Sequence, residues 1–356
     1  GPLDAAWMPR HVDRVSPCAE ACPAGNDIER LMLLAADGRL DEAARMLYEE
    51  HPFPATLGRV CPHPCETACN RSAHDGALSI NAIERAAGDR GHSASNWITA
   101  AAPSGQRVAV IGAGPAGLAA AYHLARRGHG VEIFEALPEI GGMLRWAITE
   151  YRLPPAVLGR ELEVFDKLGV TVRTGQRLGD NLDWRALDGF DAIYLATGAW
   201  KQRALGLPGE DCGRVGFGLD FLRQVRTGVA PKLGARVVIV GGGNTAIDAA
   251  RTARRQGASV DVYYDVLLAI PEEVVAARSE GIAFHEAIVP SGFEPQDDGS
   301  VRLLLRPLAT KKPQAAAAPV RTESRIADHV LVCIGGDADL AYAAAAGLPS
   351  GPRIAV

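Results

Sequence analysis

The sequence predicts an α/β protein in which two Rossmann-like dinucleotide-binding domains follow a helical, cysteine-rich domain. Three observations support this organisation. Five of the 7 cysteines lie within the first 69 residues. Two glycine-rich turns, beginning at Gly112 and Gly241, each follow a short apolar run and precede a helical pattern. Since strand, glycine turn, helix and strand make a βαβ unit, each turn predicts a buried parallel sheet.

Length and composition limit the possible functions. A chain of 356 residues can form two or three domains, each with its own core. The net charge is −5 and Lys and Arg are scattered, so we expect no nucleic-acid partner. We find no apolar run of 18 residues and no signal peptide, and expect no membrane association and a cytoplasmic location. Gly1-Pro2 is typical of a cleaved purification tag, which would leave residues 1–7 without a biological role.

Residues 1–100 are expected to form the helical domain. Asp27 can cap a helix that Gly38 can end, and a second helix is expected over 41–49, before a proline-rich stretch. The small, polar segment 100–105 is expected to be a linker. The ordering of this domain should depend on whatever its cysteines bind.

The first glycine motif belongs to a predicted dinucleotide domain over 104–225. The motif is Gly112-x-Gly114-x-x-Gly117, and the next apolar run ends at Glu135, 23 residues beyond Gly112. Glycines at these positions let the backbone approach a pyrophosphate at a helix N-terminus, and the carboxylate can accept hydrogen bonds from ribose hydroxyls.

A second glycine motif predicts another nucleotide domain over 226–325. Here the pattern is Gly241-x-Gly243-x-x-Ala246, again between an apolar run and a helical pattern. Two such folds in one chain suggest two nucleotides. A domain that has lost its ligand and is kept only for packing remains the alternative.

The five clustered cysteines form two short motifs, Cys18-x3-Cys22-Pro and Cys61-Pro-x2-Cys65-x3-Cys69. In a reducing cytosol, clustered cysteines are more often metal ligands or redox groups than disulfides. Cys-Pro after a tight spacing is more typical of iron-sulfur ligation than of zinc, although His63 and His74 keep zinc open. The isolated Cys212 and Cys333 are expected to be structural.

Four segments together resemble a known family. They are Cys22–Ile28 (CPAGNDI), Gly58–Cys69 (GRVCPHPCETAC), Ile80–Arg85 (INAIER) and Glu150–Pro154 (EYRLP). They resemble the small (beta) subunit of bacterial glutamate synthase and the matching N-terminal portion of dihydropyrimidine dehydrogenase. The resemblance runs from about Cys18 to about Gly335 and implies an FAD and 4Fe-4S oxidoreductase. It does not imply glutamate synthesis, because the amide chemistry belongs to the large subunit.

The same resemblance assigns the two nucleotides. Residues 135–145 (EALPEIGGMLR) resemble the FAD signature of flavoproteins with two dinucleotide domains, and 194–198 (YLATG) resemble the strand that closes that domain. The implied FAD contacts from these segments are Gly142, Met143, Leu144, Arg145, Thr197 and Gly198. Residues 241–248 (GGGNTAID) resemble the pyridine-nucleotide segment. Its implied contacts are Gly241, Gly243, Asn244, Thr245 and Ala246.

One departure from the family concerns the choice between NADH and NADPH. Members usually end the second strand of this domain with Tyr-Arg-Arg, whereas this chain has Tyr264, Asp265 and Val266. A carboxylate at this position repels a 2′-phosphate but accepts a ribose 2′-hydroxyl. We therefore expect NADH rather than NADPH.

A second departure concerns the number of clusters, which is two in the family. The cluster nearer the flavin takes three cysteines and one other side chain, which match Cys22, Cys61, Cys65 and Glu84. The other cluster needs four cysteines, of which Cys18 and Cys69 are present while Arg10 and Asp13 occupy the remaining positions. We therefore expect one 4Fe-4S cluster, with Cys18 or Cys69 as alternatives to Glu84.

The C-terminal part matches the family incompletely. Residues 330–336 resemble the strand that re-enters the FAD domain, so 326–356 are expected to resume that domain. The family's second FAD segment, a Gly-Asp motif, would lie beyond Val356.

These expectations favour an electron-input module. A hydride from NADH would reduce FAD, and single electrons would leave through the cluster to a partner protein. A self-contained flavoenzyme with a structural cluster and a non-catalytic scaffold of the same fold are the alternatives. We identify no catalytic acid or base.

Overall fold

The computed structural model describes residues 15–91, 97–229, 231–308 and 323–342. The predictions for residues 1–7 and for the chain beyond 342 lie outside this part. The chain divides into two compact units. Gly1–Thr99 with Gly159–Val164 is called the helical unit, and Ala100–Leu158 with Phe165–Val356 the two-sheet unit.

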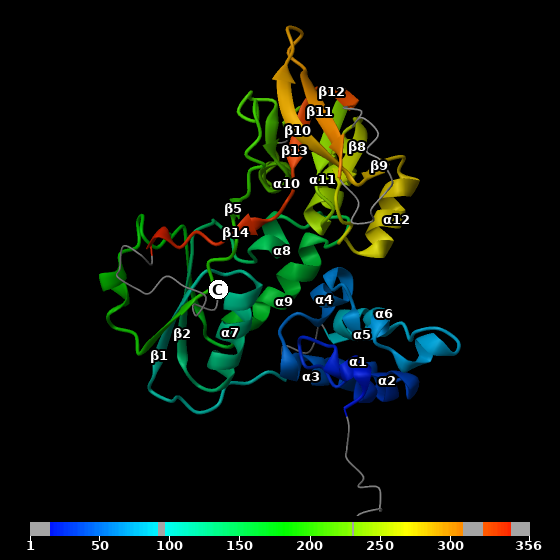
Figure 1. Ribbon diagram of the computed structural model, residues 1–356. Helices are drawn as coiled ribbons and strands as arrows, with labels where there is room; N and C mark the ends of the chain where they lie inside the picture. Colours follow the sequence, from blue (N-terminus) through cyan, green and yellow to red (C-terminus); the bar gives the residue numbers. More distant parts are fainter. Residues whose placement is uncertain (1–14, 92–96, 230, 309–322, 343–356) are drawn as a thin grey trace, which may run out of the picture. The chain divides into compact units, whose positions relative to one another are not determined.

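Short helices build the helical unit, drawn in blue to cyan in Figure 1. They are α1 (Pro17–Glu20), α2 (Ile28–Ala36), α3 (Leu40–Glu50), α4 (Pro54–Val60), α5 (Pro64–Thr67), the 3₁₀ helix η2 (Asn70–Ala73) and α6 (Ile80–Arg90). The Asp27 carboxylate accepts the Arg30 N–H at 3.0 Å and caps α2. Gly38, with φ +73°, follows that helix before α3 begins. The predicted helical hairpin is therefore confirmed.

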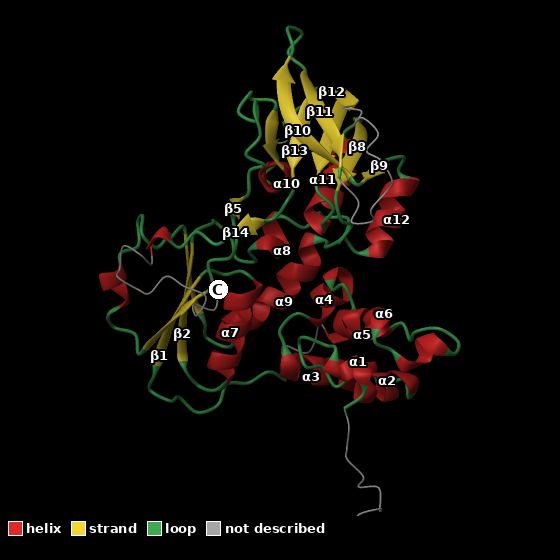
Figure 2. Ribbon diagram, in the orientation of Figure 1, coloured by secondary structure: helices red, strands yellow, loops and turns green. Residues whose placement is uncertain are grey.

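The first sheet of the two-sheet unit is parallel, in the order β3-β2-β1-β4. Its strands, yellow in Figure 2, are β1 (Arg107–Ile111), β2 (Gly130–Glu135), β3 (Thr171–Thr174) and β4 (Ala192–Leu195). The helices of this part are α7 (Pro115–Arg126), α8 (Met143–Trp146) and the 3₁₀ helix η4 (Trp184–Leu187). Helix α9 (Pro155–Lys167) contributes residues to both units, since Gly159–Val164 belong to the helical unit. A Cβ on Gly117 would lie 1.9 Å from the Gly112 carbonyl oxygen. Glycine spacing here thus reflects the close packing of β1 against α7.

The second sheet is also parallel, in the order β6-β13-β7-β8-β9. Its strands are β6 (Val215–Phe217), β7 (Arg236–Val240), β8 (Ser259–Tyr264), β9 (Ala283–Glu286) and β13 (His329–Val332). The helices of this part are α10 (Gly218–Arg226), α11 (Asn244–Arg255) and α12 (Pro271–Ser279). Both predicted βαβ units are therefore present.

Two smaller sheets complete the unit. The antiparallel sheet consists of β10 (Ile288–Pro295), β11 (Val301–Pro307) and β12 (Glu323–Ala327). Strand β5 (Lys201–Gln202) pairs with β14 (Gly336–Asp337).

Two strand assignments need correction. Residues 330–336 were expected to re-enter the first dinucleotide domain, and β6 lies within the range 104–225 predicted for that domain. Instead, β13 pairs with β6 and β7 in the second sheet. The chain leaves that sheet only after β13, where β14 meets β5, the strand that follows the 194–198 segment. An apolar run that fits either parallel sheet carries no mark of which sheet it joins, which explains the error.

Candidate functional site

The first glycine turn brings a carboxylate to the start of α7. Glu135 ends β2 and is buried. Its Oε2 accepts the Ala113 N–H at 2.6 Å and its Oε1 accepts the Leu137 N–H at 2.8 Å. Each oxygen keeps one further lone pair, so the carboxylate is fixed in place and can still accept ribose hydroxyls.

The segment that resembles an FAD signature lies against this turn. The Gly141 N–H donates to the Ala113 carbonyl at 2.8 Å, and a Cβ on Gly142 would lie 2.5 Å from the Gly114 Cα. Leu144, within α8, is buried. Arg145 is bound locally, since its Nε donates to the Ile140 carbonyl at 2.7 Å. The structure thus brings 141–145 to the first glycine motif, while Arg145 contacts its own turn.

Segment 194–198, which was predicted to close the first domain, contacts Tyr342 near the end of the described chain. Thr197 Oγ1 lies 2.8 Å from the hydroxyl of Tyr342, and Gly198 has φ +71°. Trp184 Nε1 also donates to the Tyr342 carbonyl at 3.2 Å. Tyr342 was not predicted as a site residue, because no sequence motif includes it.

The second glycine turn has one open position. Gly241 has φ +137°, and a Cβ there would lie 2.3 Å from the Cys333 carbonyl oxygen. A Cβ on Gly242 would lie 2.1 Å from the Val266 carbonyl oxygen, but a Cβ on Gly243 would meet nothing within 4 Å. Gly243 is the N-cap residue of α11. The free space at this helix N-terminus is where a pyrophosphate can approach the backbone.

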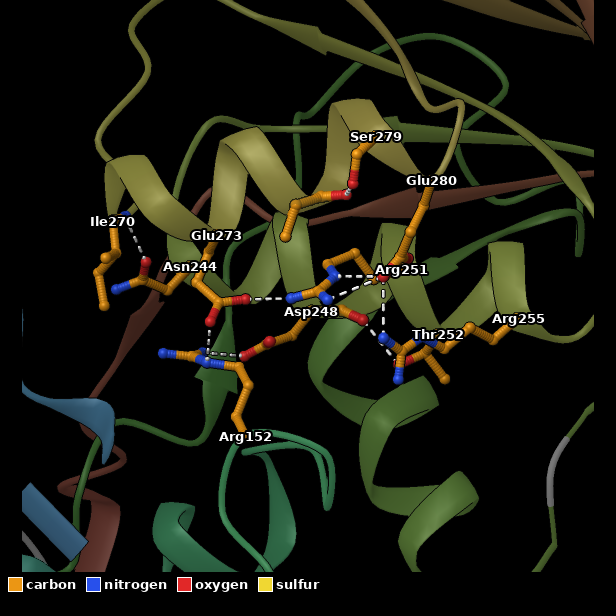
Figure 3. Close-up of polar contacts among 11 residues, drawn as sticks. Arg152, Asn244, Asp248, Arg251, Thr252, Arg255, Ile270, Glu273, Ser279 and Glu280 are labelled. Atoms are coloured by element: carbon orange, nitrogen blue, oxygen red, sulfur yellow. Dashed lines mark hydrogen bonds and ion pairs between the residues drawn. The ribbon is translucent and has the colours of Figure 1, made fainter. Parts of the chain in front are cut away.

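The other predicted residues of this turn differ in exposure. Ala246 is fully buried in the core beneath α11. Asn244 is exposed, and its Oδ1 accepts the Ile270 N–H at 2.9 Å (Figure 3). Thr245 is half-buried. Asp265 is exposed directly after β8, where its Oδ1 accepts the Val266 N–H at 2.7 Å.

A buried ion-pair network joins the loop after α8 to the second nucleotide fold (Figure 3). Arg152 pairs with Asp248 of α11 at 2.7 Å and with Glu273 of α12 at 3.2 Å, and the Arg152 and Asp248 side chains are each 5% exposed. Arg251 pairs with Glu273 and, at 2.8 Å, with Glu280. We call these five residues the clasp. Burial, opposed by Arg152, raises the pKa of Asp248 to about 6.

The clasp was not predicted from the sequence. Arg152 and Asp248 both lie in quoted segments, EYRLP and GGGNTAID, but no role was assigned to either. The sequence feature that could have indicated this pair is the presence of charged residues in both motifs, with Arg152 in the first and Asp248 in the second.

Four of the predicted cluster ligands, namely Cys22, Cys61, Cys65 and Glu84, lie in one neighbourhood of the helical unit. Burial raises the pKa of the Cys65 thiol to about 12, with the charges of Cys22 and Cys61 adding to the effect. Burial also raises the pKa of Cys61, and Glu84 and Cys22 are among the charges that contribute. These four side chains are therefore close enough to interact electrostatically. Desolvated thiols of this kind ionise on binding a metal, which makes the set chemically suitable for iron.

The remaining two cysteines of the motifs have other neighbours. Cys18 Sγ donates to Ser16 Oγ at 3.3 Å. Backbone N–H groups of Leu78 and Arg71 lower the pKa of Cys69, and no other cysteine is among the main causes. Arg10 and Asp13 lie outside the described residues. Within the described ranges, no three His, Cys, Asp or Glu side chains are arranged to hold a single metal ion.

Comparison with protein families agrees with this division of the chain. Residues 106–356 match the pyridine nucleotide-disulphide oxidoreductase family. Residues 13–96 match the 4Fe-4S cluster domain II of dihydropyrimidine dehydrogenase. These matches support FAD and a 4Fe-4S cluster as the cofactors.

Several curated relatives are similar over most of this chain. The beta subunit of an NADPH-Fe(3+) oxidoreductase from Geobacter sulfurreducens is 36% identical over 94% of this chain and 53% of its own length. The beta subunit of an NADP(+)-dependent formate dehydrogenase from Moorella thermoacetica is 39% identical over 78% and 44%. The small chain of glutamate synthase [NADPH] from Escherichia coli is 35% identical over 80% and 65%. The chain thus spans about half the length of the first of these relatives.

Solved structures show the same fold. A 2-naphthoyl-CoA reductase matches with a TM-score of 0.56 and 23% identity over 96% of this chain and 54% of its own. Thioredoxin reductase of Lactococcus lactis matches with a TM-score of 0.51 and 24% identity over 69% and 82%.

In the described part of the chain, every helix is too short or too polar to cross a bilayer. The predicted fold class and family are confirmed: the chain belongs to the pyridine nucleotide-disulphide oxidoreductase family and carries an N-terminal 4Fe-4S domain of the dihydropyrimidine dehydrogenase type.

Proposed function

We propose that this chain is the electron-input module of a larger oxidoreductase. When bound, FAD would accept a hydride from NADH and pass its electrons singly to one 4Fe-4S cluster. The observation that carries the proposal is a pair of dinucleotide-type turns in one compact unit, together with three neighbouring thiols and a buried carboxylate in the other. The electrons would then leave to a partner protein, as the subunit names of the relatives suggest.

In this proposal, chain residues bind and orient the two nucleotides. The α7 N-terminus and Glu135 would hold the pyrophosphate and ribose of FAD, and residues 141–145 and 197–198 would contact the rest of it. The α11 N-terminus at Gly243 would hold the pyrophosphate of NADH. The clasp fixes α11 to the loop that follows the FAD segment, and so sets the orientation of one nucleotide relative to the other.

The cluster would be held by Cys22, Cys61, Cys65 and Glu84. Cys69, whose pKa is lowered by backbone N–H groups of Leu78 and Arg71, is one alternative to Glu84, because a lowered pKa favours the thiolate. Cys18, which is hydrogen-bonded to Ser16, is the other alternative. One cluster per chain follows, because Cys18 and Cys69 alone cannot hold a second.

The test is an anaerobic titration of the purified protein with NADH, followed by absorption, together with iron and labile sulfide analysis. Bleaching of both flavin and cluster, with about four iron and four sulfide per chain, is expected. Bleaching of flavin alone would favour a self-contained flavoenzyme with a structural cluster. No bleaching would favour a non-catalytic scaffold, and about eight iron per chain would contradict the single cluster.

The NADH preference depends on Asp265, and several relatives carry NADPH in their names. Flavin reduction should be faster with NADH than with NADPH. Asp265→Arg should shift the ratio toward NADPH by roughly 10- to 100-fold, because a charged hydrogen bond to the 2′-phosphate replaces a repulsion. Asp297→Arg makes the same charge change at an exposed residue between β10 and β11 and should leave the ratio unchanged. Equal rates with the two nucleotides in the unmodified protein would contradict the preference.

A further inference from the structure

A buried carboxylate of the helical unit has two potential hydrogen-bond donors beside one of its oxygens. Glu84 of α6 is 6% exposed. Its Oε1 lies 3.3 Å from Asn26 Nδ2 and 3.6 Å from His51 Nε2. Both of these contacts involve Oε1. Since each carboxylate oxygen has its own lone pairs, Oε2 can accept a separate ligand.

The contact of His51 Nδ1 shows which nitrogen of the ring carries the hydrogen. Its Nδ1 accepts the Phe53 N–H at 3.2 Å, so the ring hydrogen of the neutral side chain is on Nε2. The side chain is 8% exposed, and Nε2 has no partner within hydrogen-bond distance. A buried N–H without an acceptor is unfavourable. The oxygen that faces this N–H is Glu84 Oε1, which lies slightly beyond hydrogen-bond distance from Nε2.

The donors reach this carboxylate from different elements. Asn26, which is 3% exposed, precedes the N-cap of α2, whereas His51 is the C-cap residue of α3. Glu84 lies within α6. Cys22 and Cys65 pack in the same core as Ile80 and Ile83 of α6, the helix that carries Glu84. Asn26 thus donates a hydrogen bond to Oε1, and the His51 N–H faces the same oxygen slightly beyond hydrogen-bond distance.

We propose that His51 and Asn26 are positioning residues for the fourth cluster ligand, holding Glu84 Oε1 by hydrogen bonds and leaving Oε2 to bind iron. This inference rests on the proposed function, in which Glu84 completes the ligand set. Hydrogen bonds to a ligating carboxylate fix its orientation and withdraw negative charge from it. Both donors therefore raise the reduction potential of the cluster and slow its loss.

The test compares variants purified anaerobically, by EPR-monitored redox titration, the EPR line shape of the reduced cluster, and the rate of iron release to a ferrous chelator. His51→Leu should lower the potential, change the EPR spectrum and speed iron release by roughly 10- to 100-fold. Asn26→Leu should act in the same direction. His51→Gln, which keeps an N–H donor at the position of Nε2, should restore most of the wild-type behaviour. His74→Leu changes an exposed histidine of the same unit and should have no effect.

The outcomes separate this inference from the function on which it rests. A His51→Leu protein with wild-type potential, spectrum and release rate would overturn the inference while leaving the proposed function intact. If His51→Leu lost the cluster and Glu84→Ala kept it, His51 itself would be the ligand and the positioning role would be wrong. Wild-type protein without an iron-sulfur cluster would reject both. If His51→Leu does not fold, as judged by circular dichroism, Asn26→Leu provides the same comparison.

Discussion

At the residue scale, the second glycine turn contains glycines that are needed for different reasons. Gly243 has open space where a Cβ would stand, so Gly243→Ala should fold with an unchanged unfolding temperature. The added methyl group would nevertheless occupy the approach of the pyrophosphate, and KM for NADH should rise roughly tenfold, equivalent to about 1.4 kcal/mol. Gly241→Ala should instead destabilise the protein by at least about 1–2 kcal/mol, because it combines φ +137° with a backbone clash.

Thermal unfolding and NADH kinetics on both variants check this prediction. Gly243→Ala with unchanged KM would show that the nucleotide does not approach this turn. Equal stability of the two variants would show that the backbone at Gly241 can relax.

At the element scale, the clasp holds α11 and α12 against the loop after α8. Arg152→Met would leave the Asp248 carboxylate buried beside an apolar side chain, and removing one partner of a buried ion pair costs about 3–5 kcal/mol. The double variant with Asp248→Asn should recover part of this loss. Arg203→Met breaks an exposed pair with Asp337 and should cost at most about 1 kcal/mol, which provides the control.

Unfolding by denaturant, followed through tryptophan fluorescence, measures these differences. If Arg152→Met were no less stable than Arg203→Met, the clasp would not hold the helices together. Additive effects in the double variant would show that Arg152 and Asp248 do not interact.

The clasp also predicts a pH dependence. Burial raises the pKa of Asp248 from 3.8 to about 6, against the opposing charge of Arg152. The folded protein therefore binds more protons than the unfolded chain between about pH 4 and pH 6. The contribution of this group to stability is complete below about pH 4 and is lost as the pH rises through about 6, by on the order of 2–3 kcal/mol. The difference in unfolding free energy between wild type and Asp248→Asn should show this slope, and a flat difference would contradict it.

Features that depend on residues close together in the sequence were predictable, whereas contacts between elements far apart in the sequence were not. The glycine turns, Glu135 and the Asp27 cap follow from spacings that a single strand, turn or helix requires. The Arg152–Asp248 pair joins residues 96 positions apart, so only the packing of two folds defines it. Strand β13 was assigned to the wrong sheet for the same reason.

The cluster site shows the same difference between local features and contacts of distant residues. Its cysteines were found from their spacing, whereas the groups beside Glu84 were not, because Asn26 precedes α2, His51 follows α3 and the two share no motif.

At the scale of the whole molecule, the two units differ in what stabilises them. The two-sheet unit has extended parallel sheets with continuous apolar cores. In the helical unit, α1, α5 and η2 have only 4 residues each, which is too short for independent helix stability. Cys18 lies in α1, Cys22 just beyond it and Cys65 in α5, so a bound cluster would tie these short helices together.

Removing the cluster should therefore destabilise the helical unit selectively. After anaerobic chelation of the iron, limited proteolysis should cleave first between residues 15 and 75, because metal binding and folding are coupled in small sites of this kind. Reduction of the flavin by NADH should continue, since both nucleotide turns lie in the two-sheet unit. Cys212→Ser, at an isolated cysteine of that unit, controls for effects of the treatment on other thiols. Equal protease resistance with and without iron would show that the cluster does not stabilise the helical unit, and loss of flavin reduction would show that the two-sheet unit depends on it.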